Sequence, residues 1–335
     1  MSTDKKRVSQ FSYIRVISCF AIVLLHCINT ARAYYMDGLS ASGLTSVYTA
    51  CSILMWPVPC FLMVTGALLL DPSRELKASK LFGKYIRRMV CALLVFTLIF
   101  TLIKYMSGES DNFFGFFVDN LLHDRAMPHL WYLYLMIVLY LLMPLFKLIV
   151  DKLSEHSLWI ITGAVLLIVS VLPMGEYLGM EGLNAYLPTF IIYPTYLFIG
   201  YLVYGRNPSA LLSTVLLAAS TIALAALTYS MRSRGIDAGL ISSYNSILVV
   251  LQATSAYSLM LRIKAEAGKW IQSLDECSFG IYLIHMIFIR LTMKEMGFNP
   301  FDFGPFAFLP MAILFFALSY AVALPIKKAT GSAVI

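Results

Sequence analysis

The sequence predicts an all-α integral membrane protein with about ten transmembrane helices. Three observations carry this prediction: 60% of the 335 residues are hydrophobic, only 13% are charged, and the mean hydropathy is +0.79. Soluble domains carry roughly 25% charged residues and lack the interior needed to bury so much apolar surface. Several apolar runs also reach the ~20 residues that a helix needs to cross a bilayer.

Ten apolar segments have a suitable length, and together they predict one multi-span membrane domain over residues 1–335. They cover residues 11–33, 47–70, 85–106, 130–150, 158–173, 188–205, 209–230, 244–263, 279–294 and 304–326. The fifth and the ninth are the shortest. Within the second, Trp56-Pro57-Val58-Pro59 places two prolines close together. Two prolines cannot both keep regular helical hydrogen bonding, so a kink or break is expected there.

The distribution of basic residues predicts that both termini are cytoplasmic. With the N-terminus inside, 17 of the 25 Lys and Arg residues fall on the inner side and seven on the outer side, and Arg15 lies within the first span. The net charge of +7 therefore indicates membrane orientation and not nucleic-acid binding. The outer segment 107–129 mixes Phe and Leu with polar residues, which predicts a short helix on the outer membrane surface.

Neither cysteines nor carboxylates indicate a site. The six cysteines fall mostly within apolar runs and form no Cys-x-x-Cys pair, so no metal site or disulfide framework is predicted. All 18 Asp and Glu residues are assigned to loops or to the ends of spans. The predicted spans therefore offer few carboxylates for a proton relay, which is the usual device of proton-coupled transporters.

The ionisable residues predicted within the spans are basic, namely Arg15 and His26 in the first and His285 in the ninth. Arg15 and His26 are eleven residues apart, which places them on one helix face about 16 Å apart. Arg15 is expected near the cytoplasmic end of the helix and His26 beyond the midplane. The alternative roles are snorkelling of Arg15 to the inner headgroups and a hydrogen bond from His26 to another helix.

A basic cluster precedes the third span on the inner side. It contains Lys84, Arg87 and Arg88. Such residues anchor spans on the cytoplasmic side. They also bind phosphates through charge-assisted hydrogen bonds, so a nucleotide diphosphate is the alternative ligand.

Polar and aromatic residues mark two further positions. His129 and Trp131 open the fourth span on the outer side, where aromatic residues also form interfacial belts. Tyr282 and His285 are three residues apart in the ninth span and share one helix face. Both positions fit ligand binding, and both also fit helix–helix contacts.

Five motifs of this chain occur in the order found in one family. They are Arg15 followed by His26, the segment 57–66 (PVPCFLMVTG), Lys84-x-x-Arg87, the segment 129–133 (HLWYL) and the segment 278–285 (SFGIYLIH). Together they resemble the membrane acyltransferase-3 family over nearly the whole chain. The similarity is closest to the branch that O-acetylates surface polysaccharides. Thr65 and Lys84 depart mildly from the pattern, in which Ser and Arg are common.

The resemblance implies a membrane O-acyltransferase of the bacterial plasma membrane. The acyl donor would be cytoplasmic acyl-CoA, expected to be acetyl-CoA, with no metal involved. The acceptor would be a hydroxyl of a cell-envelope glycan or lipid-linked sugar. The expected partners are thus the lipid bilayer, the donor and the acceptor, and whether a second copy or a partner protein takes part stays open.

The chemistry assigns roles to these residues. A neutral histidine suits the removal of a hydroxyl proton, so His26 is the expected catalytic base. The cations expected to bind acyl-CoA are Lys84, Arg87 and Arg88 at its phosphates and Arg15 at the mouth of a channel that the pantetheine arm enters. The candidates for substrate binding or for stabilising the oxyanion are His129, Trp131, Tyr282 and His285. A carboxylate that orients His26 is expected from an outer loop, where Asp119 and Asp124 are available.

Two other functional classes fit part of the sequence. A membrane transporter or flippase for a sugar or an amino acid would also have many helices, a broken second span and buried basic residues. A sensory or scaffold membrane module would share the helices alone. A transporter does not explain why the Arg15–His26 spacing occurs together with the inner basic cluster.

Overall fold

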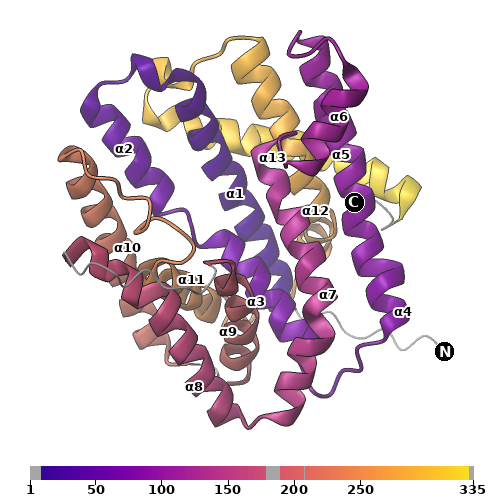
Figure 1. The fold of residues 1–335 in the computed structure, drawn as a ribbon, viewed down its shortest axis with the longest axis vertical. Coiled ribbons are helices and arrows are strands. Elements are labelled where there is room, and N and C mark those ends of the chain that lie inside the picture. The colour runs from indigo at the N-terminus through magenta and orange to yellow at the C-terminus, as the bar shows by residue number, and fades with distance from the viewer. Residues whose placement is uncertain (1–8, 179–188, 207, 332–335) are drawn as a thin grey trace.

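The protein is a bundle of helices. The computed structural model describes residues 9–178, 189–206 and 208–331, and every regular element in these ranges is helical. The helices are α1 (Ser9–Tyr35), α2 (Ala41–Ser52), α3 (Pro57–Leu69), α4 (Ala78–Lys80), α5 (Arg87–Met106), α6 (Phe113–Leu122), α7 (Trp131–Lys152), α8 (Glu155–Leu166), α9 (Ile192–Arg206), α10 (Ala210–Ser233), α11 (Ile247–Met260), α12 (Lys269–Arg290) and α13 (Phe308–Thr330) (Figure 1).

Eight helical segments in the described part of the chain are long and apolar enough to cross a membrane. They contain α1, α2 with α3, α4 with α5, α7, α8, α10, α12 and α13. The predicted all-helical membrane class is confirmed. The other two predicted spans, 188–205 and 244–263, contain α9 and α11, which have only 15 and 14 residues. Each covers about 21–23 Å, less than the ~30 Å hydrocarbon core, so the count of ten stays a prediction.

The predicted break in the second span is confirmed, and it lies just before the prolines. Helix α2 ends at Ser52, and Pro57 begins α3, where the missing N–H of a proline costs no helical hydrogen bond. The side-chain amide of Gln252 on α11 donates to the carbonyl of Ile53 at 3.1 Å and to the hydroxyl of Thr221 on α10 at 2.9 Å. A carbonyl freed by the break is therefore satisfied by protein, as irregular backbone at membrane depth requires.

Helices α3 and α9 touch backbone to backbone through two glycines. A Cβ atom on Gly66 would lie 1.9 Å from the carbonyl oxygen of Leu197, and one on Gly200 would lie 2.1 Å from that of Met63. Small residues allow such close approach, which drives helix association in membranes. Gly66 ends the proline-containing motif of the second span, so its role in this structure is packing.

Gly200→Ala is expected to destabilise the protein by at least about 1–3 kcal/mol, because the added methyl group overlaps the α3 backbone. The matched control is Gly205→Ala on the same helix, where nothing lies within 4 Å of the added Cβ. Thermal unfolding in detergent measures both. Equal melting temperatures for the two variants would contradict the close contact of α3 and α9.

Helix α12 corrects the predicted ninth span. The helix begins at Lys269, ten residues before the predicted start at residue 279, and continues as the turn Leu291–Glu295. Asp275 therefore lies inside a helix and is 4% exposed. The assignment of every carboxylate to a loop or span end is wrong for Asp275. A charged group is tolerated here because Arg15 on α1 pairs with it.

The two ends of the bundle differ. At one end α4 continues through the π-helical segment Leu81–Ile86 into α5, and α6 lies near the other end of α5 (Figure 1). Asn120 of α6 donates to the hydroxyl of Thr101 on α5 at 3.1 Å. Phe114 and Leu122 on α6 are 74% and 71% exposed. The short helix predicted in segment 107–129 is confirmed, and apolar side chains are exposed on its surface.

The orientation of the bundle remains a prediction with a direct test. A Ser73→Cys variant in the α3–α4 loop is expected to resist a membrane-impermeant maleimide added to intact cells. An Asp111→Cys variant before α6 is expected to react, because the positive-inside distribution places that segment outside. The unaltered protein gives the background of its six cysteines. Labelling of Ser73→Cys from outside would reverse the assigned orientation.

Candidate active site

A cavity of about 960 Å³ lies between α1, α3, α7, α12 and the segment from the α3–α4 loop to α5. Its lining is rich in charge. Seven cations and three carboxylates contribute: Arg15, Arg74, Lys77, Lys80, Lys84, Arg88 and Lys327, with Glu75, Asp275 and Glu276. Lys77, Lys80 and Lys84 are exposed, so they mark the mouth of the cavity.

Four of the seven cations have carboxylate partners. The pairs are Arg15–Asp275 at 2.5 Å, Lys327–Glu276 at 2.6 Å, Lys77–Glu75 at 3.5 Å and Arg74–Asp71 at 3.5 Å. Burial works to raise the pKa of the Asp71 carboxyl, but hydrogen bonds from Ser73 and the charges of Arg74 and Lys147 bring this pKa below its usual value. Asp71 is thus an anion at neutral pH.

The other three cations, here called the cation row, are Lys80, Lys84 and Arg88. They recur every four residues along one continuous helical segment, and all three line the cavity. Within the described ranges none of them has a carboxylate partner. Lys80 lies over the ring of Tyr85, and the Arg88 guanidinium lies 4.5 Å from the ring centroid of Phe279. Three neighbouring like charges that no described carboxylate pairs with make this a site for an anionic group of a ligand.

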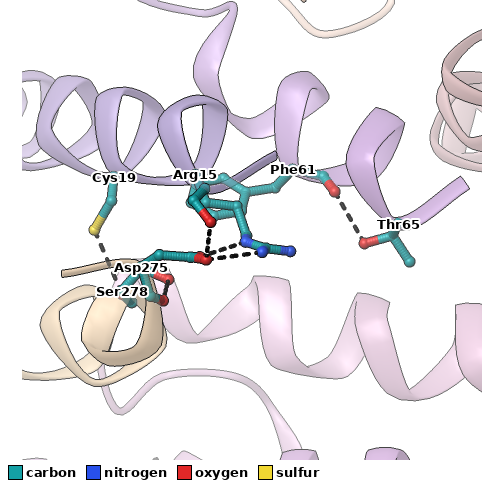
Figure 2. A network of polar contacts seen from close by, with 7 residues as sticks. Arg15, Cys19, Phe61, Thr65, Asp275 and Ser278 are labelled. Carbon is teal, nitrogen blue, oxygen red and sulfur yellow. Dashed lines mark hydrogen bonds and ion pairs between the residues drawn. The ribbon is translucent and has the colours of Figure 1, made fainter. Parts of the chain in front are cut away.

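Deeper in the cavity, Arg15 and Asp275 join α1 to α12 (Figure 2). The Arg15 Nε and Nη2 atoms donate to the two carboxylate oxygens at 2.5 and 2.9 Å. The Ser12 hydroxyl, one turn earlier on α1, donates to the same carboxylate at 2.7 Å. On α12 the Ser278 hydroxyl donates to the Asp275 carbonyl at 2.8 Å, and the Ser278 carbonyl accepts from the Cys19 thiol at 3.4 Å.

Three histidines, here called the histidine cluster, meet beyond the cavity. They are His26 on α1, His129 in the turn Pro128–Leu130 and His285 on α12. The rings of His26 and His285 are nearly parallel and meet edge to edge, with centroids 5.0 Å apart, and the ring of His129 lies 6.2 and 5.6 Å from them. Tyr282 lies between cluster and cavity, because it lines the cavity while its hydroxyl donates to the His129 carbonyl.

A chain of hydrogen bonds fixes the tautomers of two of these histidines. His285 Nδ1 lies 3.1 Å from the carbonyl of Ile281, which can only accept, so this nitrogen carries the proton. His285 Nε2 is then an acceptor, and His26 Nδ1, 2.7 Å away, must donate to it. Neutral His26 therefore holds its free lone pair on Nε2, the state that a general base needs.

His129 is the unpartnered member of the cluster. It is 1% exposed, and neither ring nitrogen has a partner with hydrogen-bond geometry among the described residues, although the Leu283 backbone interacts with the ring. A buried ring N–H without a partner is costly. It is also available to a polar atom of a ligand, since a neutral imidazole always carries one donor and one acceptor.

The comparison with known proteins bears on this arrangement. Residues 8–327 match the family model Acyl_transf_3, described as an acyltransferase domain. The chain belongs to the acyltransferase-3 family. No curated protein and no solved structure matches it. This family membership, together with the eight apolar helices, makes the protein a multi-pass membrane acyltransferase.

The structure places most of the predicted site residues of this acyltransferase in two groups. Arg15, Lys84, Arg88 and Tyr282 line the cavity, and the three histidines converge beyond it. Arg87 is exposed and does not belong to the lining, although it neighbours Arg88.

Trp131 lies apart from these groups. Its ring is 5.5 Å from that of Tyr193 and 5.7 Å from that of Tyr244, outside the cavity lining. Its described contacts are with the aromatic cluster at the start of α7, and its role toward a substrate stays a prediction.

The expected carboxylate partner of His26 is not found among the described residues. Asp119 instead pairs with Arg125 at 3.1 Å and lies 2.9 Å from the ring of His123. Asp124 has a backbone φ of 52°, and burial raises the pKa of its carboxyl to about 6. Neither carboxylate hydrogen-bonds to His26, whose described partner is His285. A second histidine thus takes the place assigned to a carboxylate.

The sequence interpretation missed several cavity residues. Lys80 had a usable signal, because it lies four residues before Lys84 and eight before Arg88. Asp275 was placed in a loop because the polar stretch 269–278 hides the start of α12. Lys327, from α13 far along the chain, had no local signal.

Proposed function

We propose that this acyltransferase is an O-acetyltransferase of the bacterial plasma membrane. It takes the acetyl group from acetyl-CoA and transfers it to a hydroxyl of a cell-envelope glycan or lipid-linked sugar. The observation that carries the proposal is the cation row, whose three cations have no carboxylate partner among the described residues and line a cavity that leads toward the histidine cluster. Family membership supplies the acyl-transfer chemistry.

The cavity fits the donor in charge and in size. Lys80, Lys84 and Arg88 supply the hydrogen-bond donors that phosphates prefer, and the Arg88 Nε atom is buried without a partner in the described structure. The volume of about 960 Å³ is at the upper end of the ~300–1,000 Å³ typical of small-molecule sites. The pantetheine arm would extend from the cation row along α1.

The path along α1 connects the cavity to the base. Arg15 and Ile22 line the cavity, and His26 lies one further turn along the same helix, about 6 Å beyond Ile22. Tyr282 occupies the boundary between them. In our proposal the thioester reaches this boundary from the cavity, and the acceptor hydroxyl arrives from the opposite side.

The proposed reaction needs one base and one oxyanion donor. His26 Nε2 takes the proton of the acceptor hydroxyl while the hydroxyl oxygen forms a bond to the acetyl carbonyl carbon. The bond from that carbon to sulfur then breaks, and the CoA thiolate receives the proton from His26. His285 Nε2 accepts the N–H of His26 and stabilises the imidazolium formed in between. The unpartnered His129 ring is the best-placed donor for the oxyanion.

The donor is tested with purified protein in detergent. Acetyl-CoA at about 100 times its Kd is expected to stabilise the folded state by about 2.7 kcal/mol, seen as a higher melting temperature. Free CoA should act similarly, because the cation row binds its phosphates. The absence of any shift with acetyl-CoA and with CoA would overturn the proposal and favour a transporter.

The acceptor is tested in cells. Mass spectrometry of envelope glycans and lipid-linked sugars, with and without the gene, is expected to show loss of O-acetyl groups. Unchanged acetylation in a strain that expresses the protein would refute the glycan acceptor. Side-by-side binding of succinyl-CoA and acetyl-CoA distinguishes the acyl group.

A further inference from the structure

The Arg15–Asp275 pair uses only one edge of the guanidinium. Nε and Nη2 engage the carboxylate, while Nη1 makes no hydrogen bond to any residue that the structure describes. The Asp275 side chain is 1% exposed, but that of Arg15 is 22% exposed and lines the cavity. The edge formed by Nη1 and Nη2 is thus available to a ligand, since a guanidinium carries five N–H donors in a fixed fork.

Asp275 is itself held in place. The Ser12 hydroxyl donates to its carboxylate from α1. The Ser278 hydroxyl donates to its backbone carbonyl from the next turn of α12 (Figure 2). A carboxylate anchored by a hydroxyl and by a bidentate arginine has little freedom to rotate. The plane of the Arg15 guanidinium is therefore set by α12 as well as by α1.

Charge divides the cavity into two parts. The Arg15–Asp275 pair is neutral as a unit, whereas Lys80, Lys84 and Arg88 carry three charges without a described carboxylate partner. An anionic group gains most beside unpaired cations, and a neutralised arginine offers hydrogen bonds without net charge. The phosphates of a CoA donor therefore belong at the cation row, and an uncharged part of the donor belongs at Arg15.

We infer that Asp275 is a positioning residue that neutralises Arg15 and aims its free edge at a carbonyl oxygen of the pantetheine–thioester arm of acyl-CoA. Arg15 is thus a specificity residue for the arm and not a phosphate ligand. This inference rests on the proposed function, because it names the part of the acyl-CoA donor that one end of the cavity binds. It goes beyond that function by assigning a role to a carboxylate outside the histidine cluster.

The test compares two ligands that share the phosphates. Acetyl-CoA carries the arm, and adenosine 3′,5′-bisphosphate has phosphates but no arm. In Asp275→Asn the affinity for acetyl-CoA is expected to fall about 10- to 100-fold, the scale of one lost charge-assisted hydrogen bond. The affinity for the bisphosphate is expected to stay within about twofold, because the cation row is intact.

A second variant guards against misfolding of Asp275→Asn. The double variant Arg15→Met with Asp275→Leu replaces the buried pair by apolar side chains, a change that proteins often tolerate. It should give the same selective loss of acetyl-CoA affinity. If the pair only holds α1 against α12, the double variant will bind acetyl-CoA as the unaltered protein does, and the inference is overturned. Equal losses for both ligands in either variant would also overturn it.

Failure of the proposed function would look different. In that case the unaltered protein would bind neither acetyl-CoA nor the bisphosphate. If the unaltered protein instead binds both ligands, and the ratio of its affinities for acetyl-CoA and the bisphosphate is unchanged in the variants, only the role of Asp275 is wrong.

Discussion

His26→Gln is expected to lower acetyl transfer at least ~100-fold, the usual scale for a lost general base, while the protein still inserts and binds acetyl-CoA. Glutamine can hydrogen-bond but cannot take up a proton at neutral pH. Donor binding should survive because the lone pair of His26 Nε2 lies beyond the cavity and contributes nothing to the cation row. The measurement is acetylated acceptor per unit of inserted protein, alongside acetyl-CoA affinity.

Three further histidine variants make this result interpretable. His156→Gln, at an exposed position on α8, controls for the substitution itself and should leave transfer unchanged. His26→Asn places an amide near the position of Nδ1, so it can keep the contact with His285 if His26→Gln fails to insert. His285→Gln should cost less than His26→Gln, since His285 sets the tautomer of the base and stabilises its imidazolium but does not itself take the proton. Near-normal transfer by both His26 variants would move the base to His285 or His129.

Loss of Lys84 and Arg88 together is expected to weaken acetyl-CoA binding more than 100-fold. Each charge-assisted hydrogen bond contributes about 1.5–3 kcal/mol, so two correspond to roughly 3–6 kcal/mol and a proportionally larger Kd. The measured quantities are acetyl-CoA affinity and KM, with the rate at saturating donor close to normal. Raised salt should weaken acetyl-CoA binding by the unaltered protein more than binding by the double variant.

Arg87→Ala is the matched control for Arg88→Ala. The two residues are adjacent and carry the same charge, but Arg87 is exposed and only Arg88 lines the cavity. Equal losses in the two single variants would show that the basic cluster acts only through membrane anchoring or bulk charge. A loss confined to Arg88→Ala would place the phosphates inside the cavity.

The sequence predicted the features that depend on local pattern. Apolar runs marked the eight long helices, Pro57 and Pro59 marked the break between α2 and α3, and the Phe-rich segment 113–122 marked α6. The spacing of Arg15 and His26 placed them on one helix. These inferences rest on composition and on a single periodicity, which short stretches of chain contain.

The convergence of the site could not be predicted in this way. His26 meets His285 and Arg15 meets Asp275 only because α1 packs against α12, and one sequence carries no record of that contact. The difference between Arg87 and Arg88 depends on helical phase. The π-helical turn at Leu81–Ile86 adds residues to a turn and shifts that phase, so a regular 3.6-residue period misplaces the residues after it.

The glycine contact between α3 and α9 has a consequence for entry of the donor. Because the two backbones touch at Gly66 and Gly200, there is no space for these helices to shift relative to each other, and we expect them to move as one body. Phe61, Thr65 and Leu68 of α3 line the cavity, so this wall can move only together with α9. We therefore expect widening of the cavity at another wall, where the π-helical turn carrying Lys84 can act as a hinge. The segment that carries Lys84, a proposed ligand of the donor phosphates, would then also be the segment that moves when the donor enters.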